Sequence, residues 1–255
     1  MTTSALFSTY YTPHLMIERE DRHGDHGNSA KQRRRSWRGF ITIGMNDLEI
    51  IYDMLHARYG NLNWWPAKSP YEVIVGAVLT QNTSWSNVER AIANFKERLF
   101  PETILDIRHD ELADLIRSAG FFNQKAAYLK EVTKWYAGYG FDVPAVRRDP
   151  IEKLRPELLN VKGIGRETAD SILLYAFGFP TFVVDAYTIR LCDRFPIKAG
   201  KGYDAVKSHF EKTVEKDTGI YNNYHALIVI NGKNHCKKKP MCNGCPLIGK
   251  CQQKA

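Results

Sequence analysis

The sequence contains no apolar run long enough to cross a lipid bilayer. Its longest such runs, residues 73–79 and 172–177, are far shorter than the roughly 20 residues that a membrane helix needs. No signal-peptide pattern opens the chain. We therefore expect a cytoplasmic globular protein with no membrane partner. Hydrophobic residues make up 44% of the 255 positions, which is enough to build a substantial core.

The alternating pattern of half-buried β-strands is also missing. From residue 46 onward, apolar residues recur at helical spacing, and the expected fold is all-α. Three helix starts carry a capping side chain, namely Ser69 before Pro70, Asp110, and Asp149 before Pro150. Further helices are predicted over residues 84–98, 123–138, 166–178, 186–194, 203–216 and 221–234.

Acidic residues are outnumbered in this chain. The 36 Lys and Arg exceed the 28 Asp and Glu, so the formal net charge is +8. A basic chain with 12% aromatic residues suits an anionic partner that can stack, which favours nucleic acid. Residues 1–44 show no periodicity and include a basic run at 31–38. We expect this extension to be disordered, either as a plain tail or as a DNA-binding arm.

Cysteine is scarce outside one short segment. Four of the five cysteines follow the spacing Cys236-x5-Cys242-x2-Cys245-x5-Cys251. Disulfides would be reduced in the cytoplasm, so this spacing predicts a metal centre. Four thiolates can hold a [4Fe-4S] cluster or a zinc ion, but zinc sites more often show two Cys-x2-Cys pairs, so the spacing favours the cluster. Cys192 stands alone and is expected in the core.

A glycine-rich break interrupts two predicted helices. The segment 158–170 is helical on both sides of Gly163-Ile-Gly165 and restarts near Arg166. Glycine permits the tight turn and lets the amides at the start of the second helix approach a phosphate oxygen. An ordinary helix–helix turn would show the same pattern, but the flanking apolar helices favour a DNA-binding hairpin. The residues predicted to contact DNA there are Lys162, Gly163, Gly165, Arg166 and Thr168.

The cysteine segment resembles the cluster loop of the endonuclease III and adenine glycosylase family, in the helix-hairpin-helix DNA glycosylase superfamily. The first gap is usually six residues in that family and is five here, while the following Cys-x2-Cys-Pro-Leu and the last gap are unchanged. The resemblance implies a [4Fe-4S] cluster that is not the catalyst. It also implies that Lys237, Lys238 and Lys239 face the DNA phosphates.

The segment Phe182-Val-Val-Asp185 resembles the motif that bears the family's catalytic aspartate. The resemblance implies that Asp185 stabilises an oxocarbenium-like sugar and orients or deprotonates water. A plain helix N-cap is the simpler interpretation, and both hold together because a carboxylate at a helix N-terminus stays ionised. Glu167 stands where strand-cutting members carry a Schiff-base lysine, which predicts a monofunctional glycosylase.

Excision of a base from a duplex needs a pocket for the flipped base. Residues 63–66, 75–85, 120–126 and 162–170 resemble the 3-methyladenine glycosylase branch. This implies that Trp65, Pro66 and Trp85 sandwich the flipped base and that Gln81 fills the hole it leaves. Trp64 is a further pocket candidate, and Asn123 and Lys125 are assigned to DNA binding. The alternative is that the tryptophans are core residues.

The predicted architecture has two helical domains that flank a DNA-binding cleft. Residues 65–181 form a six-helix domain with the hairpin, and residues 45–64 pack with 182–255 as the cluster domain. We expect a monomer that associates with the nucleoid when bound to DNA.

The predicted function is excision of damaged bases from double-stranded DNA, with alkylated purines such as 3-methyladenine as substrates. Electron-poor alkylated bases stack well on indole and leave easily. One alternative is an endonuclease III type glycosylase and AP lyase for oxidised pyrimidines, and another is a non-catalytic DNA-binding protein with a cluster.

Overall fold

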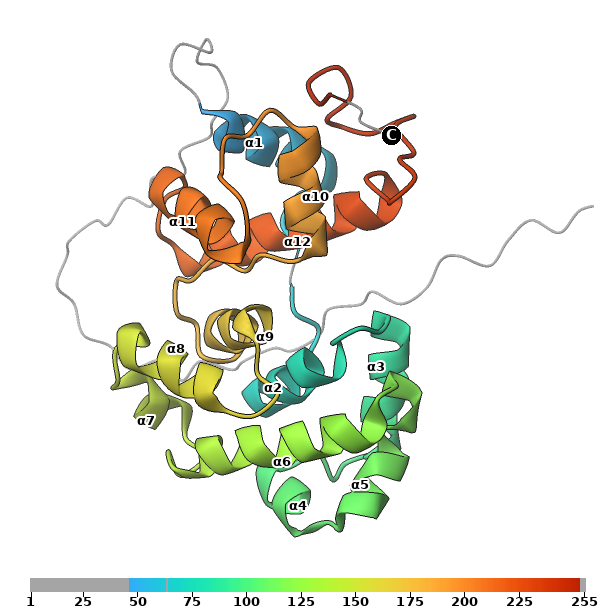
Figure 1. Cartoon of the computed structure of the whole chain (residues 1–255), viewed down its shortest axis with the longest axis vertical. Helices are drawn as coiled ribbons and strands as arrows, with labels where there is room; N and C mark the ends of the chain where they lie inside the picture. The colour runs from blue at the N-terminus through green and yellow to red at the C-terminus, as the bar shows by residue number, and fades with distance from the viewer. Residues whose placement is uncertain (1–45, 63, 253–255) are drawn as a thin grey trace, which may run out of the picture. The chain divides into compact units, whose positions relative to one another are not determined.

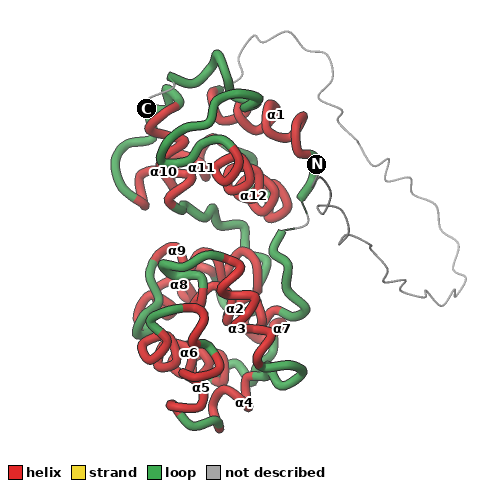
Figure 2. The backbone as a smooth tube through the Cα atoms, turned by 90° about the vertical axis from the view of Figure 1, so that its right-hand side faces the viewer, coloured by secondary structure: helices red, strands yellow, loops and turns green. Residues whose placement is uncertain are grey.

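The computed structural model describes residues 46–62 and 64–252, which fall in one compact unit. All regular structure in this part of the chain is helical, and Figure 2 shows helices joined by loops without a strand. The prediction of an all-α fold is confirmed. None of the described helices is both long and apolar enough to span a membrane. The predicted N-terminal extension, residues 1–44, lies outside the described residues.

Across the described ranges the chain forms twelve α-helices, a 3₁₀ turn (η1) and a π-helical segment (η2). In chain order they are α1 (Asp47–Tyr59), α2 (Pro70–Leu79), α3 (Trp85–Asn94), α4 (Pro101–Asp106), α5 (His109–Leu115), η1 (Arg117–Ala119), α6 (Phe122–Ala137), α7 (Val143–Arg147), α8 (Ile151–Asn160), α9 (Arg166–Ser171), η2 (Ile172–Ala176), α10 (Ala186–Arg194), α11 (Tyr203–Thr213) and α12 (Thr218–Asn234).

Side-chain caps start several of these helices. At α1, Asn46 and Glu49 form a capping box, in which each side chain accepts a hydrogen bond from the other residue's backbone amide. At α2, Ser69 caps the helix and Pro70 takes its first position, as predicted. These bonds satisfy amides that have no acceptor within the helix.

Two predicted helix starts differ from the structure. Helix α5 begins at His109, one residue before Asp110, and has no side-chain cap. Helix α8 begins after Pro150, and Asp149 does not cap it. The Asp149 carboxylate instead accepts hydrogen bonds from the Tyr139 hydroxyl at 3.0 Å and from the Lys153 ammonium at 2.6 Å. The Asp149 carboxylate therefore bonds to the side chains of Tyr139 and Lys153 and does not accept from the backbone amides at the start of α8.

Two hydrophobic cores organise the helices. The first comprises buried residues from α2 through η2, including Ile74, Leu129 and Phe177. The second joins Leu48, Ile51 and Leu55 of α1 to the residues that follow Phe182. In Figure 1, α1 and α10 to α12 gather in one group and α2 to α9 in another. The domain boundaries at 64/65 and 181/182 stay a prediction.

A buried carboxylate links the hairpin region to α11. Asp170 of α9 has no exposed side-chain surface and accepts two hydrogen bonds from Arg155 of α8, at 2.8 and 3.0 Å. It also accepts from the hydroxyls of Tyr203 at 2.7 Å and Thr181 at 3.1 Å, and the Lys207 ammonium lies 3.6 Å away. These contacts hold α11, from the second core, against the helix that follows the hairpin.

Candidate active site

Asp185 is the N-cap of α10. Its Oδ1 accepts hydrogen bonds from the Thr188 amide at 2.7 Å and the Thr188 hydroxyl at 2.9 Å. Its Oδ2 lies 3.6 Å from Nε2 of His225, too far for a hydrogen bond but close enough for electrostatic attraction. Burial raises the pKa of this carboxyl, yet His225 and Thr188 outweigh burial and leave the pKa below its ordinary value. Asp185 is therefore ionised at neutral pH.

Glu167 is the second carboxyl of the site. It lies in the first turn of α9, and it reaches solvent through an open cleft although protein surrounds it on most sides. Burial and the negative charge of Asp185 raise the pKa of Glu167 to about 7, and His225 opposes this shift. Two neighbouring carboxyls whose pKa values are pushed apart are typical of sites that handle protons.

The cleft has a volume of about 540 Å³ and lies between the loop after α2 and the hairpin. It brings together several residues that were predicted separately. Its lining comprises Ala77, Thr80, Gln81, Asn82, Tyr128, Gly163, Gly165, Arg166, Glu167, Thr168, Ser171 and Tyr203. Gln81 Nε2 donates to the Gly163 carbonyl and to the Thr168 hydroxyl, both at 3.0 Å. The hairpin therefore fixes the position of Gln81.

The Thr168 side chain is buried and its hydroxyl already accepts from Gln81, so the hydroxyl holds Gln81 in place. A contact of Thr168 with DNA would run through its backbone amide, and that contact stays a prediction.

The hairpin has the geometry that its glycines predict. Gly163 has φ +87°, and a Cβ there would lie 2.1 Å from the Tyr128 ring, so the position requires glycine. A Cβ on Gly165 would meet open space. The first backbone hydrogen bond of α9 runs from the Ala169 amide to the Gly165 carbonyl, at 2.8 Å. The amides of residues 166–168 precede it, and such amides are suited to bind an anion.

The structure does not show the predicted base sandwich between Trp65 and Trp85. Their rings meet edge to face, with centroids 5.2 Å apart and planes at 86°, so no parallel slot separates them. Both indoles pack over Gly76 of α2, where a Cβ would lie 3.2 Å from Trp65 and 3.4 Å from Trp85. Because Gly76 has no side chain, the two indole rings can contact each other directly above it. Pro66 is exposed beside them.

Trp65 also contacts Tyr175 of η2, with ring centroids 5.1 Å apart and planes at 48°. Trp85 Nε1 donates to Glu89 at 3.0 Å. Trp64 has a different neighbour, because the ammonium of Lys233 in α12 lies 5.5 Å from its ring centroid. Trp65 and Tyr175 thus form one aromatic pair, and Trp64 packs towards α12.

Lys125 is not a DNA contact. Its side chain is 2% exposed, and Nζ donates to the carbonyls of Leu79 and Ala119, both at 2.8 Å. Burial lowers the pKa of this ammonium to about 8. The two hydrogen bonds of Nζ connect the C-terminal ends of α2 and η1. They hold the loops that follow these two elements next to each other. Those loops carry Gln81 and the exposed ring of Phe121, so the buried Lys125 helps to fix the backbone that positions Gln81 in the cleft.

The remaining predicted DNA contacts are on the surface. Asn123, Lys162 and the run Lys237, Lys238 and Lys239 are all exposed. Arg194 donates to the carbonyls of Lys237 at 2.6 Å and Lys238 at 2.8 Å, which fixes the backbone beneath those lysines.

The four clustered cysteines line one pocket. Its walls are Leu191, Arg194, Asn231, His235, Cys236, Pro240, Cys242, Cys245, Leu247 and Cys251. Arg194 also donates to Cys236 Sγ at 3.2 Å. No three His, Cys, Asp or Glu side chains among residues 46–62 and 64–252 lie close enough to share a single metal ion. Four cysteine thiols are the donor set of a [4Fe-4S] cluster and also of a structural zinc, so the residues that line this pocket fit a cluster.

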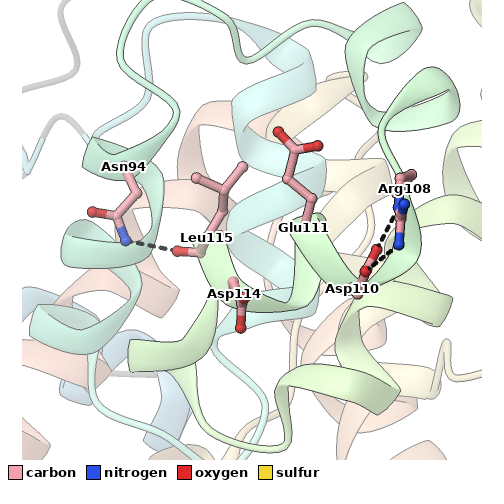
Figure 3. A pocket seen from close by; sticks show the side chains of 6 residues that line it. All are labelled: Asn94, Arg108, Asp110, Glu111, Asp114 and Leu115. Atoms are coloured by element: carbon pink, nitrogen blue, oxygen red, sulfur yellow. Dashed lines mark hydrogen bonds and ion pairs between the residues drawn. The ribbon is translucent and has the colours of Figure 1, made fainter.

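Another hollow, of about 730 Å³, lies away from these residues and is shown in Figure 3. It is lined by Asn94, Arg108, Asp110, Glu111, Asp114 and Leu115. Three of its six side chains are carboxylates, and its one arginine already pairs with Asp110. This charge repels a polyanion, so the hollow is not a DNA site.

The hairpin and Asp185 lie in a segment that is similar to a known protein family. The family model described as "HhH-GPD superfamily base excision DNA repair protein" matches residues 75–216, a span that includes both. This chain belongs to the HhH-GPD superfamily. It is therefore a DNA glycosylase, an enzyme of base excision repair that hydrolyses N-glycosyl bonds.

Two relatives and one solved structure illustrate the similarity of this HhH-GPD protein to others. A candidate DNA repair glycosylase of Methanocaldococcus jannaschii, MJ1434, is 51% identical over 80% of this chain and 95% of its own length. Endonuclease III of Haemophilus influenzae is 29% identical over 73% of this chain and 85% of its own. The H. pylori 3-methyladenine DNA glycosylase MagIII, solved with 1,N6-ethenoadenine, is 28% identical with a TM-score of 0.64, over 74% of this chain and 98% of that one.

Proposed function

We propose that this enzyme removes damaged bases by hydrolysis alone, with Asp185 as its catalytic carboxylate. One observation carries the proposal: Asp185 is held ionised at the start of α10, and the carboxyl nearby is Glu167, where strand-cutting relatives need an amine. A carboxyl group cannot form a Schiff base with the sugar. The enzyme would therefore leave an intact strand with an abasic site.

The chain's own groups suggest the steps of this reaction. Amides at the start of α9 and the exposed lysines bind phosphates, and Gln81 occupies the place of the flipped nucleotide. As the N-glycosidic bond lengthens, positive charge develops on the sugar, and the Asp185 carboxylate stabilises it. Asp185 then orients or deprotonates the attacking water. The pKa of Glu167 is raised to about 7, so near neutral pH this carboxyl is only partly ionised and adds less negative charge than Asp185.

We propose alkylated purines as the substrate class. MagIII, whose structure was solved with an alkylated adenine, aligns with 74% of this chain. Alkylated bases are good leaving groups, so a site with one carboxylate and no strong general acid suffices for them. Trp65 and Tyr175 supply an aromatic wall for an electron-poor base, worth about 1–2 kcal/mol per stacking contact. The base stacks against this wall, since Trp65 and Trp85 leave no slot between them.

We also propose that Cys236, Cys242, Cys245 and Cys251 hold a [4Fe-4S] cluster. When bound, such a cluster supplies structural cross-linking of the C-terminal segment and no step of base excision. Arg194 supports this segment through its bonds to Cys236 and to the carbonyls of Lys237 and Lys238. The three lysines would then be presented to DNA by a rigid loop.

Purified protein is expected to be brown, with about four iron and four sulfide per chain and broad absorption in the blue. Cys245→Ser should lose the colour and the iron, because it removes one ligand. The matched control is Cys192→Ser, a cysteine outside the pocket, which should keep both. A colourless anaerobic preparation with stoichiometric zinc would contradict the cluster.

The proposed reaction is tested by product analysis on oligonucleotides that each contain one lesion. The panel holds an alkylated purine, an oxidised pyrimidine and a deaminated pyrimidine, with and without borohydride. We expect base release from the alkylated strand, no borohydride-trapped complex, and strand cleavage only after alkali. Glu167→Lys is the matched variant, since it places an amine on α9 near Asp185, and weak trapping by it alone would support the assignment. Efficient borohydride trapping of a complex between the unaltered protein and DNA would contradict the proposed hydrolytic reaction and would assign the protein to the AP lyases.

A further inference from the structure

A buried histidine lies against the catalytic carboxylate. His225 of α12 is 5% exposed, its Nδ1 lies 2.5 Å from the Tyr175 hydroxyl, and its Nε2 lies 3.6 Å from Oδ2 of Asp185. Nε2 has no hydrogen-bond partner among the residues that the structure describes. The three side chains form a line from η2 through α12 to the N-cap of α10.

The surroundings of His225 determine where its proton lies. A bare Nε2 would turn a lone pair towards an ionised carboxylate, which is repulsive. A proton on Nε2 is attracted to that carboxylate and leaves Nδ1 free to accept from the Tyr175 hydroxyl. Burial and the charge of Asp185 hold the pKa of Tyr175 well above its usual range, so the phenol retains its proton to donate. His225 therefore presents an N–H to Asp185 in both its neutral and its charged form.

The His225 N–H acts on the second oxygen of Asp185 by electrostatic attraction across 3.6 Å. Both hydrogen bonds from Thr188 go to Oδ1, and Oδ2 faces His225. A nearly buried carboxylate oxygen without a donor favours the protonated acid, because burial disfavours charge. A neutral acid cannot stabilise a developing sugar cation.

We propose that His225 and Tyr175 are positioning residues for Asp185, in which the Tyr175 hydroxyl sets the His225 proton on Nε2 and this N–H keeps the Asp185 carboxylate ionised and in one orientation. The proposal rests on the catalytic role proposed for Asp185. The titratable groups that face His225 from the packed elements are Asp185, Tyr175 and Glu167. Tyr175 also contacts Trp65, so the same ring forms part of the aromatic wall.

Three variants test the proposal. His225→Leu removes the N–H and keeps an apolar side chain, His225→Gln returns an amide N–H near the place of Nε2, and Tyr175→Phe removes only the hydroxyl and keeps the ring against Trp65. Excision is measured as single-turnover rate against pH, on the lesion that the wild type cleaves best. The carboxyl ¹³C resonance of Asp185, assigned with Asp185→Asn, is titrated in parallel without DNA.

Loss of the N–H should raise the Asp185 pKa. For His225→Leu, we expect the acid limb of the rate profile and the carboxyl titration to move up by about one pH unit, which lowers the rate about fivefold at the midpoint of the wild-type limb and by up to about tenfold below it. His225→Gln should recover most of the shift, and Tyr175→Phe should give a smaller shift in the same direction. DNA affinity should stay unchanged, since none of these side chains is offered to phosphates.

Unchanged acid limbs and carboxyl titrations in His225→Leu and Tyr175→Phe would overturn the proposal. If His225→Leu does not fold, Tyr175→Phe decides, because it removes one hydroxyl from a hydrogen bond and leaves the packing in place. The NMR titration requires no catalysis, so it reports on His225 even if the wild type excises none of the lesions. Absence of excision in the wild type would instead contradict the proposed function.

Discussion

Replacing Asp185 with asparagine is expected to abolish measurable base excision while DNA binding persists. The amide oxygen of asparagine can still accept from the Thr188 amide and hydroxyl, so the start of α10 keeps its cap. The variant loses only the negative charge, which the proposed mechanism uses to stabilise the sugar cation. Removal of one preorganised electrostatic group costs on the order of 10² to 10³ in rate, and we expect at least this loss.

The measurement is single-turnover excision, with DNA affinity determined on the same oligonucleotide. Asp193→Asn is the matched control. It makes the same change in charge on the same helix, but at an exposed residue. It should keep the wild-type rate. Near-normal turnover by Asp185→Asn would show that another group is the catalyst.

Asp170→Asn is expected to have the largest effect on folding stability. The fully buried Asp170 carboxylate bonds both to Arg155 and to Tyr203, and Lys207 lies nearby. Its neutralisation removes the buried counter-charge of Arg155 and Lys207, which keep only Asp204, 3.6 Å from Arg155, and the half-buried Glu211 beside Lys207. Breaking a buried ion pair from one side costs about 3–5 kcal/mol, and we expect a loss of about 3 kcal/mol in the free energy of unfolding because Asn still accepts one hydrogen bond.

Urea unfolding at constant protein concentration measures this loss as a lower midpoint. Asp204→Asn is the control, since Asp204 lies 3.6 Å from Arg155 and 3.1 Å from Arg166 but is 58% exposed. Such exposed pairs contribute less than about 1 kcal/mol. Equal midpoints for the two variants would mean that the buried network does not hold α11 against α9.

Features with a local cause were predictable from the chain. Helix α10 has the predicted bounds, because its cap and apolar spacing lie within the segment itself. Helices α4 and α7 were missed, since six and five residues are too few for a helical period to stand out. The Gly163 turn was predictable because glycine readily adopts its positive φ, whereas the close approach of the Tyr128 ring is seen only in the structure.

One DNA-contact assignment is wrong and one predicted ring arrangement is not seen, because both depend on tertiary contacts. Lys125 has the charge of a DNA contact, but the ends of α2 and η1 occupy its donors in the interior. Trp65 and Trp85 have the chemistry of a base sandwich, but Gly76 lets their rings meet edge to face. No pattern near these residues in the chain indicates either outcome.

The sequence by itself determined the all-helical fold, the glycine hairpin, the spacing of the four cysteines and the cap at Asp185. Each of these follows from the chemistry of neighbouring residues. Only the tertiary structure decided that the pKa of Asp185 lies below its ordinary value despite burial, that the pKa of Glu167 is raised to about 7 and that His225 lies beside Asp185. Protonation depends on desolvation and on charges a few ångströms away in space, and the packing of α9, α10 and α12 alone brings those groups together.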